Sequence, residues 1–332
     1  MQAWWVARPG PVRTRPLRMG KRAAPVPRAG EVRLRVSCCG VCRTDLHLAE
    51  GDLPPRRPGV ISGHEIVGYV DAVGTRAGRF ALGDRVGVAW LRATCGRCRF
   101  CRRGQENLCL APRFTGWDDD GGFAEQCVVH EAFAYRLPLR YDDLHAAPLL
   151  CSGIIGYRAL RLASVPPAGV LGIYGFGASA HLTAQLALKQ GARVHVMTRS
   201  PAAQALALEL GVSSAAGPSR RPPEPLDSAI LFAPVGDLVP ASLQALVAGG
   251  TLAVAGIHLS AIPELDYGRD LFQERVLRSV TANTRLDGEQ LMALADAMDL
   301  RVVTSPYAFD SADVALRDLA EDRVNGAAVL RA

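Results

Sequence analysis

The sequence predicts an α/β protein of two domains, one mainly β and one built on a doubly wound parallel sheet. Residues 1–150 contain short strand-like runs between Gly/Pro turns, such as Val32–Val36, Ile66–Val73 and Val86–Ala89. From Cys151 onward, strand-like and helix-like runs alternate, as a parallel sheet requires. After about Val280 the chain is expected to return to the first domain. The expected domains are therefore residues 1–150 plus 281–332, and residues 151–280.

Composition restricts the class of protein. The 332 residues are 49% hydrophobic and 21% charged with a net charge of +6, which indicates globular domains rather than disorder, collagen or a coiled coil. Arginines are scattered along the chain instead of forming one stripe, so we expect no nucleic-acid partner.

No membrane segment is expected either. The N-terminus lacks a basic region followed by an apolar one, and the most apolar window, Leu238–Ile257, is punctuated by Pro240 and Gly249-Gly250. We interpret this window as a helix, a turn and a buried strand (Thr251–Gly256). The expected location is the cytoplasm.

Four of the nine cysteines follow the pattern Cys95-x2-Cys98-x2-Cys101-x7-Cys109. An odd total argues against a disulfide framework, whereas four closely spaced thiolates close a tetrahedral zinc shell. We expect a structural zinc in a lobe of about residues 92–111. Buried free cysteines and a nucleic-acid-binding zinc module, suggested by flanking arginines, are the alternatives; no recognition-helix pattern follows the lobe.

A second set of metal-ligand types is dispersed along the chain: Cys42, His64 and Cys151. Two thiolates, one imidazole and a vacant fourth position describe a catalytic zinc site. Taken singly, each residue has an ordinary interpretation, as a loop histidine or a core cysteine. Their occurrence on both sides of the four-cysteine lobe favours the zinc interpretation.

The second domain opens with a dinucleotide-binding pattern. A buried strand, Val170–Tyr174, leads into Gly175-Phe-Gly177-Ala-Ser-Ala180, a helix-like run His181–Gln190 and a second strand, Gly191–Met197. Gly175 permits the tight turn, and Gly177 lets a pyrophosphate approach the helix N-terminus.

The second strand ends in Thr198-Arg199-Ser200 instead of the acidic residue that binds the 2′-hydroxyl of NAD. A guanidinium and two hydroxyls would bind a 2′-phosphate, so NADP(H) is favoured over NAD(H). The alternative is that Arg199 stacks on adenine and NAD is used.

Several longer motifs resemble one family. These are Gly63-His-Glu-Ile-Val-Gly68-x5-Gly74, Gly83-Asp-Arg-Val-Gly87, the four-cysteine lobe and Asp120-Gly-Gly-Phe-Ala-Glu125. Over essentially its whole length the chain resembles the zinc-dependent medium-chain alcohol dehydrogenases, in particular their bacterial branch. The resemblance implies a GroES-like catalytic domain, a Rossmann-type cofactor domain and an active site between them.

The resemblance also implies roles for individual residues. Cys42, His64 and Cys151 would hold catalytic zinc, with Glu65 able to enter the shell and Asp45 orienting His64. Thr44 would bind the substrate hydroxyl and pass its proton through the cofactor ribose to His47. Trp90 and Leu91 would line the substrate pocket, with Trp117 near its mouth. The cofactor would be bound by Arg43, Gly175, Phe176, Gly177, Ala178, Ser179, Thr198, Arg199, Ser200 and Ile257.

Simpler interpretations exist for three of these residues. Asp45 could cap a helix that starts near Thr44. His47 could be a surface histidine, and Trp90 could be core packing.

Three positions depart from the family pattern. Ile155 and Ser179 replace residues that commonly contact nicotinamide, and Ala327 falls near an arginine that often contacts pyrophosphate. The leading hypothesis is a dehydrogenase for small alcohols or aldehydes with two zinc ions per chain, forming a dimer or tetramer through its cofactor domains. The alternatives are a redox-silent homologue that retains zinc and a zinc-stabilised binding or regulatory protein. Zinc-free reductases are disfavoured by the zinc-ligand motifs.

Overall fold

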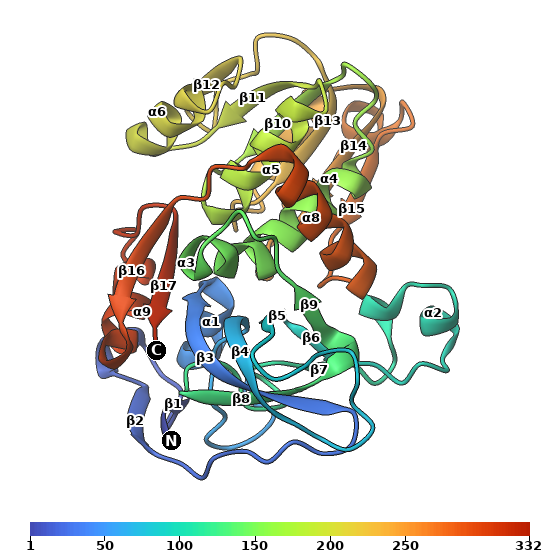
Figure 1. Ribbon diagram of the computed structural model, residues 1–332. Coiled ribbons are helices and arrows are strands. Elements are labelled where there is room, and N and C mark those ends of the chain that lie inside the picture. Colours follow the sequence, from blue (N-terminus) through green and yellow to red (C-terminus); the bar gives the residue numbers. More distant parts are fainter. The chain divides into compact units, whose positions relative to one another are not determined.

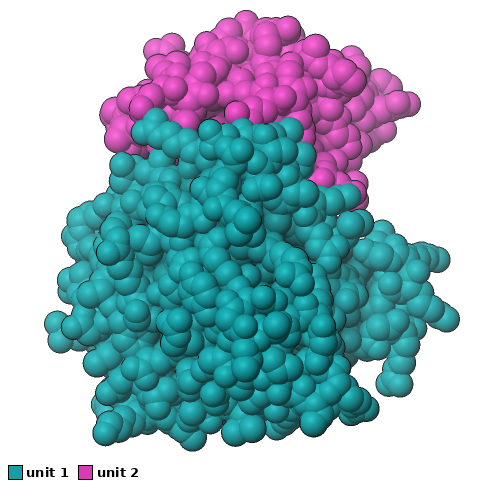
Figure 2. All heavy atoms as spheres, viewed as in Figure 1, with its two compact units in different colours: residues 1–151, 282–332 teal, residues 152–281 magenta.

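The computed structural model describes all 332 residues and divides them into two compact units. The first unit comprises Met1–Cys151 and Ala282–Ala332, and the second comprises Ser152–Thr281 (Figure 2). Both changes of unit fall one residue after the boundaries expected from the sequence. Cys151 therefore belongs to the same unit as Cys42 and His64.

A seven-stranded sheet forms the centre of the first unit. Its strand order is β16-β17-β3-β4-β5-β9, and β8 also pairs with β3. All pairings are antiparallel except the parallel pair β16–β17. The strands and helices of this unit are β1 (Gln2–Val6), η1 (Val12–Thr14), β2 (Leu17–Lys21), β3 (Glu31–Val41), α1 (Arg43–Glu50), β4 (Glu65–Val73), β5 (Arg85–Val88), β6 (Leu91–Ala93), α2 (Arg99–Arg102), η2 (Glu106–Leu108), β7 (Arg113–Phe114), β8 (Gln126–His130), η3 (Glu131–Phe133), β9 (Ala134–Arg136), α3 (Asp143–Ala146), η4 (Ala147–Leu150), α8 (Arg285–Met298), β16 (Thr304–Ala308), η6 (Phe309–Ser311), α9 (Ala312–Ala320) and β17 (Ala327–Arg331).

Strand β3 carries the chain from the core to the site. Its first half alternates buried apolar residues (Val32, Leu34, Val36) with more exposed arginines, which is the period-2 pattern of a half-buried strand. The strand then continues, fully buried, through Cys38 to Val41, beyond the run expected from the sequence. It ends immediately before a predicted metal ligand, Cys42.

The second unit is a six-stranded sheet with every strand parallel, in the order β12-β11-β10-β13-β14-β15 (Figure 1). Counted along the chain, this order is 3-2-1-4-5-6, the doubly wound arrangement that binds dinucleotides where the order reverses. The predicted doubly wound α/β domain is thus confirmed. Its elements are α4 (Ser152–Ala163), β10 (Val170–Tyr174), α5 (Ala178–Lys189), β11 (Arg193–Met197), α6 (Pro201–Glu209), β12 (Ser214–Ala216), β13 (Leu226–Leu231), α7 (Leu238–Gln244), β14 (Leu246–Val254), η5 (Tyr267–Leu271) and β15 (Val276–Ser279).

The most apolar window forms α7 followed by β14. The strand begins at Leu246 instead of Thr251, so Gly249-Gly250 lies within the strand and not in a turn. A register shift against β13, between the pairs Leu226–Leu246 and Ser228–Thr251, accommodates the extra residues. None of the helices combines the length and the apolar character needed to span a membrane.

Candidate active site

Four potential metal ligands converge in the first unit. The donor atoms of Cys42, His64, Glu65 and Cys151 all lie within 4.8 Å of one another. Cys42 follows β3, His64 and Glu65 stand at the start of β4, and Cys151 follows η4. The three separate segments meet because β3 and β4 are paired in the sheet, with Gly40 opposite Glu65.

The dimensions of this cluster fit zinc. Cys42 Sγ lies 3.3 Å from His64 Nε2. Zn–S and Zn–N bonds of about 2.3 and 2.0 Å at a tetrahedral angle place the two donors about 3.5 Å apart. Two thiols and an imidazole are also the ligand types that zinc prefers.

The electrostatics of the cluster favour a bound cation. A hydrogen bond from Cys151, together with the charge of His64, holds the pKa of Cys42 well below its usual range. Burial raises the pKa of Glu65, whose Oε1 is buried without a hydrogen-bond partner. A buried polar atom without a partner costs free energy. A cation coordinated by this oxygen would therefore stabilise the site.

Asp45 contacts both the start of α1 and the His64 ring. Cys42 is the N-cap of α1, and Asp45 closes its capping box by accepting the Cys42 N–H at 3.0 Å. The other carboxylate oxygen accepts the Gly63 N–H at 3.0 Å and lies 3.5 Å from His64 Nδ1. With Nδ1 directed at Asp45, Nε2 is the His64 nitrogen left for the cluster.

The expected proton-relay residues share one face of α1. Thr44 and His47 are three positions apart, the spacing of helix neighbours. The Thr44 N–H points to Cys42 Sγ at 3.4 Å, which places this residue beside the metal cluster. His47 Nδ1 lies 3.0 Å from Asp52 Oδ2.

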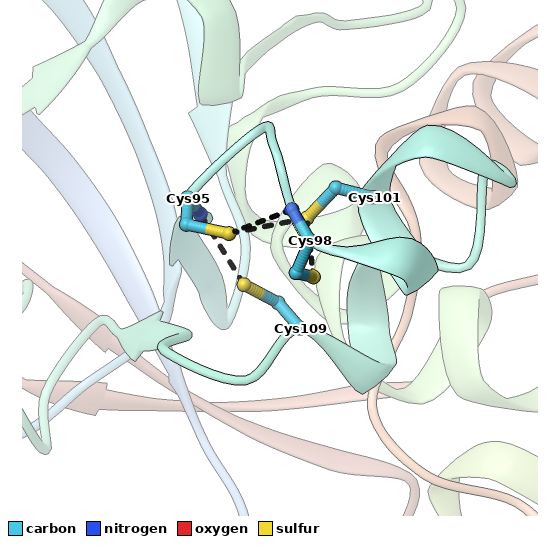
Figure 3. Close-up of side chains that lie close together, drawn as sticks. All are labelled: Cys95, Cys98, Cys101 and Cys109. Atoms are coloured by element: carbon cyan, nitrogen blue, oxygen red, sulfur yellow. Dashed lines mark hydrogen bonds between the residues drawn. The ribbon is translucent and has the colours of Figure 1, made fainter.

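The four cysteines Cys95, Cys98, Cys101 and Cys109 form a second compact set of potential metal ligands (Figure 3). Sulfur–sulfur distances are 3.5 Å for Cys98–Cys101 and 4.0 Å for Cys95–Cys101. A tetrahedral ion with bonds of about 2.3 Å requires edges of about 3.8 Å. Backbone N–H groups of Cys101 and Leu110 lower the pKa of Cys98 to about 6, which favours a thiolate there.

Three aromatic rings gather beside His64. The Trp90 ring centroid lies 5.0 Å from that of His64 and makes edge contacts with Phe114 and Trp117 at 5.4 and 6.2 Å. Leu91 is fully buried in the hydrophobic core and pairs with Phe114 between β6 and β7. Phe114 was not singled out from the sequence, although its spacing of three from Trp117 could have indicated it.

The glycine turn of the second unit is preserved. Gly175 has φ +86°, and a Cβ there would come within 2.8 Å of Ala233 N, so the fold itself requires glycine. Gly177 is the N-cap of α5, yet a Cβ there would meet only open space. Space at a helix N-terminus that no protein atom needs fits a phosphate group. Phe176, Ala178 and Ser179 surround this cap.

The other expected cofactor residues have the following surroundings. Thr198 is buried, with its N–H bonded to Ala216 O, whereas Arg199 is exposed. Ser200 is the N-cap of α6 and accepts the Ala203 N–H at 3.4 Å, so part of its hydrogen-bonding capacity is already used. Ile257 is half exposed after β14.

Arg43 has a partner that was not foreseen. Its Nη2 lies 2.5 Å from Asp322 Oδ1, and both side chains are about half exposed. Nothing in the sequence indicated this pair, because the two residues are 279 positions apart. The three departures from the family pattern lie in α4 (Ile155), in the first turn of α5 (Ser179) and at the start of β17 (Ala327).

Comparison with known proteins identifies the family. Residues 28–139 match the model of the alcohol dehydrogenase GroES-like domain. A Mycobacterium tuberculosis protein with the name "Probable alcohol dehydrogenase AdhA" is 57% identical over 99% of this chain and 97% of its own length. The chain belongs to the zinc-dependent medium-chain alcohol dehydrogenases.

Further relatives agree with this assignment. An alcohol dehydrogenase of Geobacillus stearothermophilus is 31% identical over 91% of both chains. A cinnamyl alcohol dehydrogenase of Sorghum bicolor has a TM-score of 0.89 and 26% identity, with 100% of this chain and 98% of that chain covered. Solved structures of this fold hold NADP(H) or NAD. The predicted family, GroES-like domain and NAD(P)-dependent alcohol dehydrogenase class are confirmed, and the redox-silent alternative is not favoured.

The double role of Asp45 gives a testable prediction. Asp45→Ala should lower the free energy of unfolding by about 1 kcal/mol through the lost cap and reduce zinc affinity about 10- to 100-fold through the misoriented His64. Thermal unfolding and zinc retained after dialysis against a chelator measure the two effects. Asp287→Ala is the matched control, because Asp287 closes the other capping box of this unit, at α8. Equal zinc loss in both variants would contradict the role of Asp45 in orienting His64.

Proposed function

We propose that this dehydrogenase transfers hydride between a small alcohol or its aldehyde and a nicotinamide cofactor at the cluster Cys42, His64 and Cys151. The convergence of these ligands around a buried carboxyl, whose Oε1 has no hydrogen-bond partner, is the observation that carries the proposal. When bound, zinc would supply Lewis acidity toward the substrate oxygen, and nicotinamide would accept or donate the hydride.

The chain's own residues position the substrate and move the proton. Asp45 fixes the ring of His64, so that its Nε2 remains directed at the cluster. Thr44 orients the substrate hydroxyl and relays its proton: the Thr44 oxygen accepts the substrate proton as the hydroxyl releases its own proton toward His47, whose imidazole takes it up. Asp52 Oδ2 contacts His47 Nδ1 at 3.0 Å and orients the ring. In the reverse direction the same groups return the proton to the nascent alcohol.

The second metal site would be structural. Four thiol ligands leave no open position for a substrate, so we assign a closed zinc site to Cys95, Cys98, Cys101 and Cys109. The proposed content is two zinc ions per chain.

We assign NADP(H) as the preferred cofactor. No carboxylate follows β11, where Thr198-Arg199-Ser200 provides a guanidinium and hydroxyls. A carboxylate there would repel a 2′-phosphate, whereas a guanidinium binds it. The pyrophosphate would contact the Gly175–Gly177 turn. Arg43 is the further pyrophosphate contact that the family resemblance implies.

Substrate size is the next part of the proposal. Trp90 stands beside His64, and its edge contacts with Phe114 and Trp117 hold it there. A bulky indole next to the metal ligands favours small primary alcohols and slim aldehydes.

Two further observations support our proposals for assembly and location. Strand β15 is the edge of its sheet and exposes Val276, with Phe272 and Tyr267 exposed shortly before it. An apolar unpaired edge is a surface for a second copy, so we propose a dimer or tetramer built through the second unit. All nine cysteines are unpaired, which supports a reducing cytoplasmic location.

Titration with both cofactors tests the function. The zinc content of the protein is measured, and the protein is then titrated with NADPH and with NADH. Turnover is followed by the absorbance of the reduced cofactor in the presence of each of a panel of small aldehydes. Oxidation of NADPH by protein with about two zinc ions per chain is the expected result. Full zinc content without binding of either nucleotide would overturn the proposal.

The two metal sites should respond differently to substitution. Cys98→Ser should remove one zinc ion and lower the melting temperature, because structural zinc contributes folding free energy. Cys42→Ala should remove the other ion and abolish turnover while the fold persists. Zinc analysis, thermal unfolding and turnover separate the cases, and Cys127→Ala, in the core outside both clusters, should retain both ions. Identical behaviour of the first two variants would refute two distinct sites.

The phosphate-binding role of Arg199 predicts a selective loss. Arg199→Ala should weaken NADPH binding about tenfold more than NADH binding, the effect of one charge-assisted contact. Fluorescence titration of both cofactors measures it. Arg193→Ala, at the opposite end of β11 and paired with Glu224, is the control and should leave the ratio unchanged. Equal losses in Arg199→Ala would remove the case for NADP(H).

The Arg43–Asp322 pair predicts a gain of affinity. The carboxylate competes with the cofactor pyrophosphate for the guanidinium, so Asp322→Asn should tighten binding of both nucleotides. An exposed ion pair contributes at most about 1 kcal/mol, so the gain should stay within about fivefold and should shrink as salt is added. Asp318→Asn, which breaks the neighbouring pair with Arg323, is the control. Unchanged affinity in Asp322→Asn would show that Arg43 does not contact the phosphates.

A further inference from the structure

We infer that Gly40 is a positioning residue of the metal centre, whose missing side chain is the space that holds the Glu65 carboxyl beside the other ligands. The inference rests on the proposed zinc site at Cys42, His64 and Cys151. It concerns a residue of β3 that is not itself a ligand.

Strand pairing places Gly40 and Glu65 against each other. They are opposite each other in the antiparallel pair β3–β4, so their side-chain positions face the same side of the sheet. Side chains alternate along a strand, so position 42 lies on the same side as position 40. Cys42 follows directly after β3, and the Glu65 side chain therefore lies across Gly40 toward the Cys42 ligand.

The Glu65 carboxyl occupies the place of a side chain at position 40. A Cβ on Gly40 would overlap Glu65 Oε2 and would lie 2.6 Å from Glu65 Cδ and 2.8 Å from Glu65 Cβ. All three of these nearest atoms belong to Glu65. A methyl group at position 40 and the observed Glu65 side chain therefore exclude each other.

Backbone conformation does not explain this glycine. Gly40 lies outside the left-handed region, where thirteen other glycines of the chain are found. Gly68, on the paired strand β4, differs because a Cβ there would meet the backbone oxygen of Arg35 at 2.6 Å. Gly68 is thus required by the packing of the sheet itself, whereas Gly40 is required by one carboxyl-bearing side chain.

The consequence concerns the fourth ligand. Glu65 is 1% exposed, and its Oε1 has no hydrogen-bond partner. Glycine at position 40 lets this carboxyl lie within 4.8 Å of the two thiols and the imidazole, where its oxygen can occupy the fourth position when no substrate does. A methyl group would turn the carboxyl away and leave three ligands.

The test measures zinc affinity, with the four-cysteine site as an internal reference. Wild-type protein with two zinc ions is titrated with a chromogenic chelator, alongside Gly40→Ala, Glu65→Gly and the double variant. Gly40→Ala should weaken one ion about 10- to 100-fold, by the same factor as Glu65→Gly, and leave the other ion unchanged. The double variant should bind zinc with the same affinity as Glu65→Gly and should unfold at the same temperature as Glu65→Gly. In the double variant the methyl group at position 40 has no carboxyl to displace.

The outcomes separate this inference from the proposed function. Wild-type affinity in Gly40→Ala, or a further loss in the double variant, would overturn the role of Gly40 and leave the metal site standing. Wild-type protein that holds only one zinc ion would instead overturn the site itself. If Gly40→Ala fails to fold, the double variant decides: a folded double variant supports the inference, and an unfolded one beside folded Glu65→Gly contradicts it. Gly68→Ala is the control. It should lower stability, and combining it with Glu65→Gly should not restore that stability.

Discussion

The geometry of the metal-ligand cluster depends on the contacts of the buried Asp45 carboxylate. It caps α1 through Cys42 N, bonds Gly63 N and faces His64 Nδ1, so one buried group fixes the start of the helix and the direction of the imidazole. Burial raises the pKa of Asp45, and backbone and His64 contacts oppose that shift. Because these partners come from the ends of β3 and β4, the geometry of the metal ligands and the folding of the sheet cannot vary independently.

The same sheet brings four titratable groups together at the Cys42, His64, Glu65 and Cys151 cluster. Two thiols, a carboxyl and an imidazole lie together, with His64 and Glu65 buried and Cys42 and Cys151 half-buried. A hydrogen bond from Cys151 lowers the pKa of Cys42, whereas burial, together with the charge of Cys42, raises the pKa of Glu65, so the two groups oppose each other's ionisation. A divalent cation removes that conflict, and the close approach at Gly40 lets the carboxyl share in it.

The sequence was sufficient where chemistry is encoded by local spacing. The four-cysteine pattern, the Gly175–Gly177 turn and the alternation of strands and helices each lie within a short segment, and the structure shows all of them. The contacts that could not be predicted join distant segments: Gly40 with Glu65, and Arg43 with Asp322. Strand register and loop position create these pairs, and neither can be read from one chain without the fold.

The two sets of potential metal ligands also differ in how far apart their members lie in the sequence. The four-cysteine cluster, proposed as the structural zinc site, is drawn from residues 95–109, a loop short enough to close at small entropic cost, and its cysteines are mostly half-buried. The Cys42, His64 and Cys151 cluster needs β3, β4 and η4 in register before its ligands meet. Zinc can therefore order the lobe locally, whereas binding at the second cluster requires the folded sheet of the first unit. Metal removal from the four-cysteine site should therefore lower stability, whereas removal from the Cys42, His64 and Cys151 site should lower reactivity.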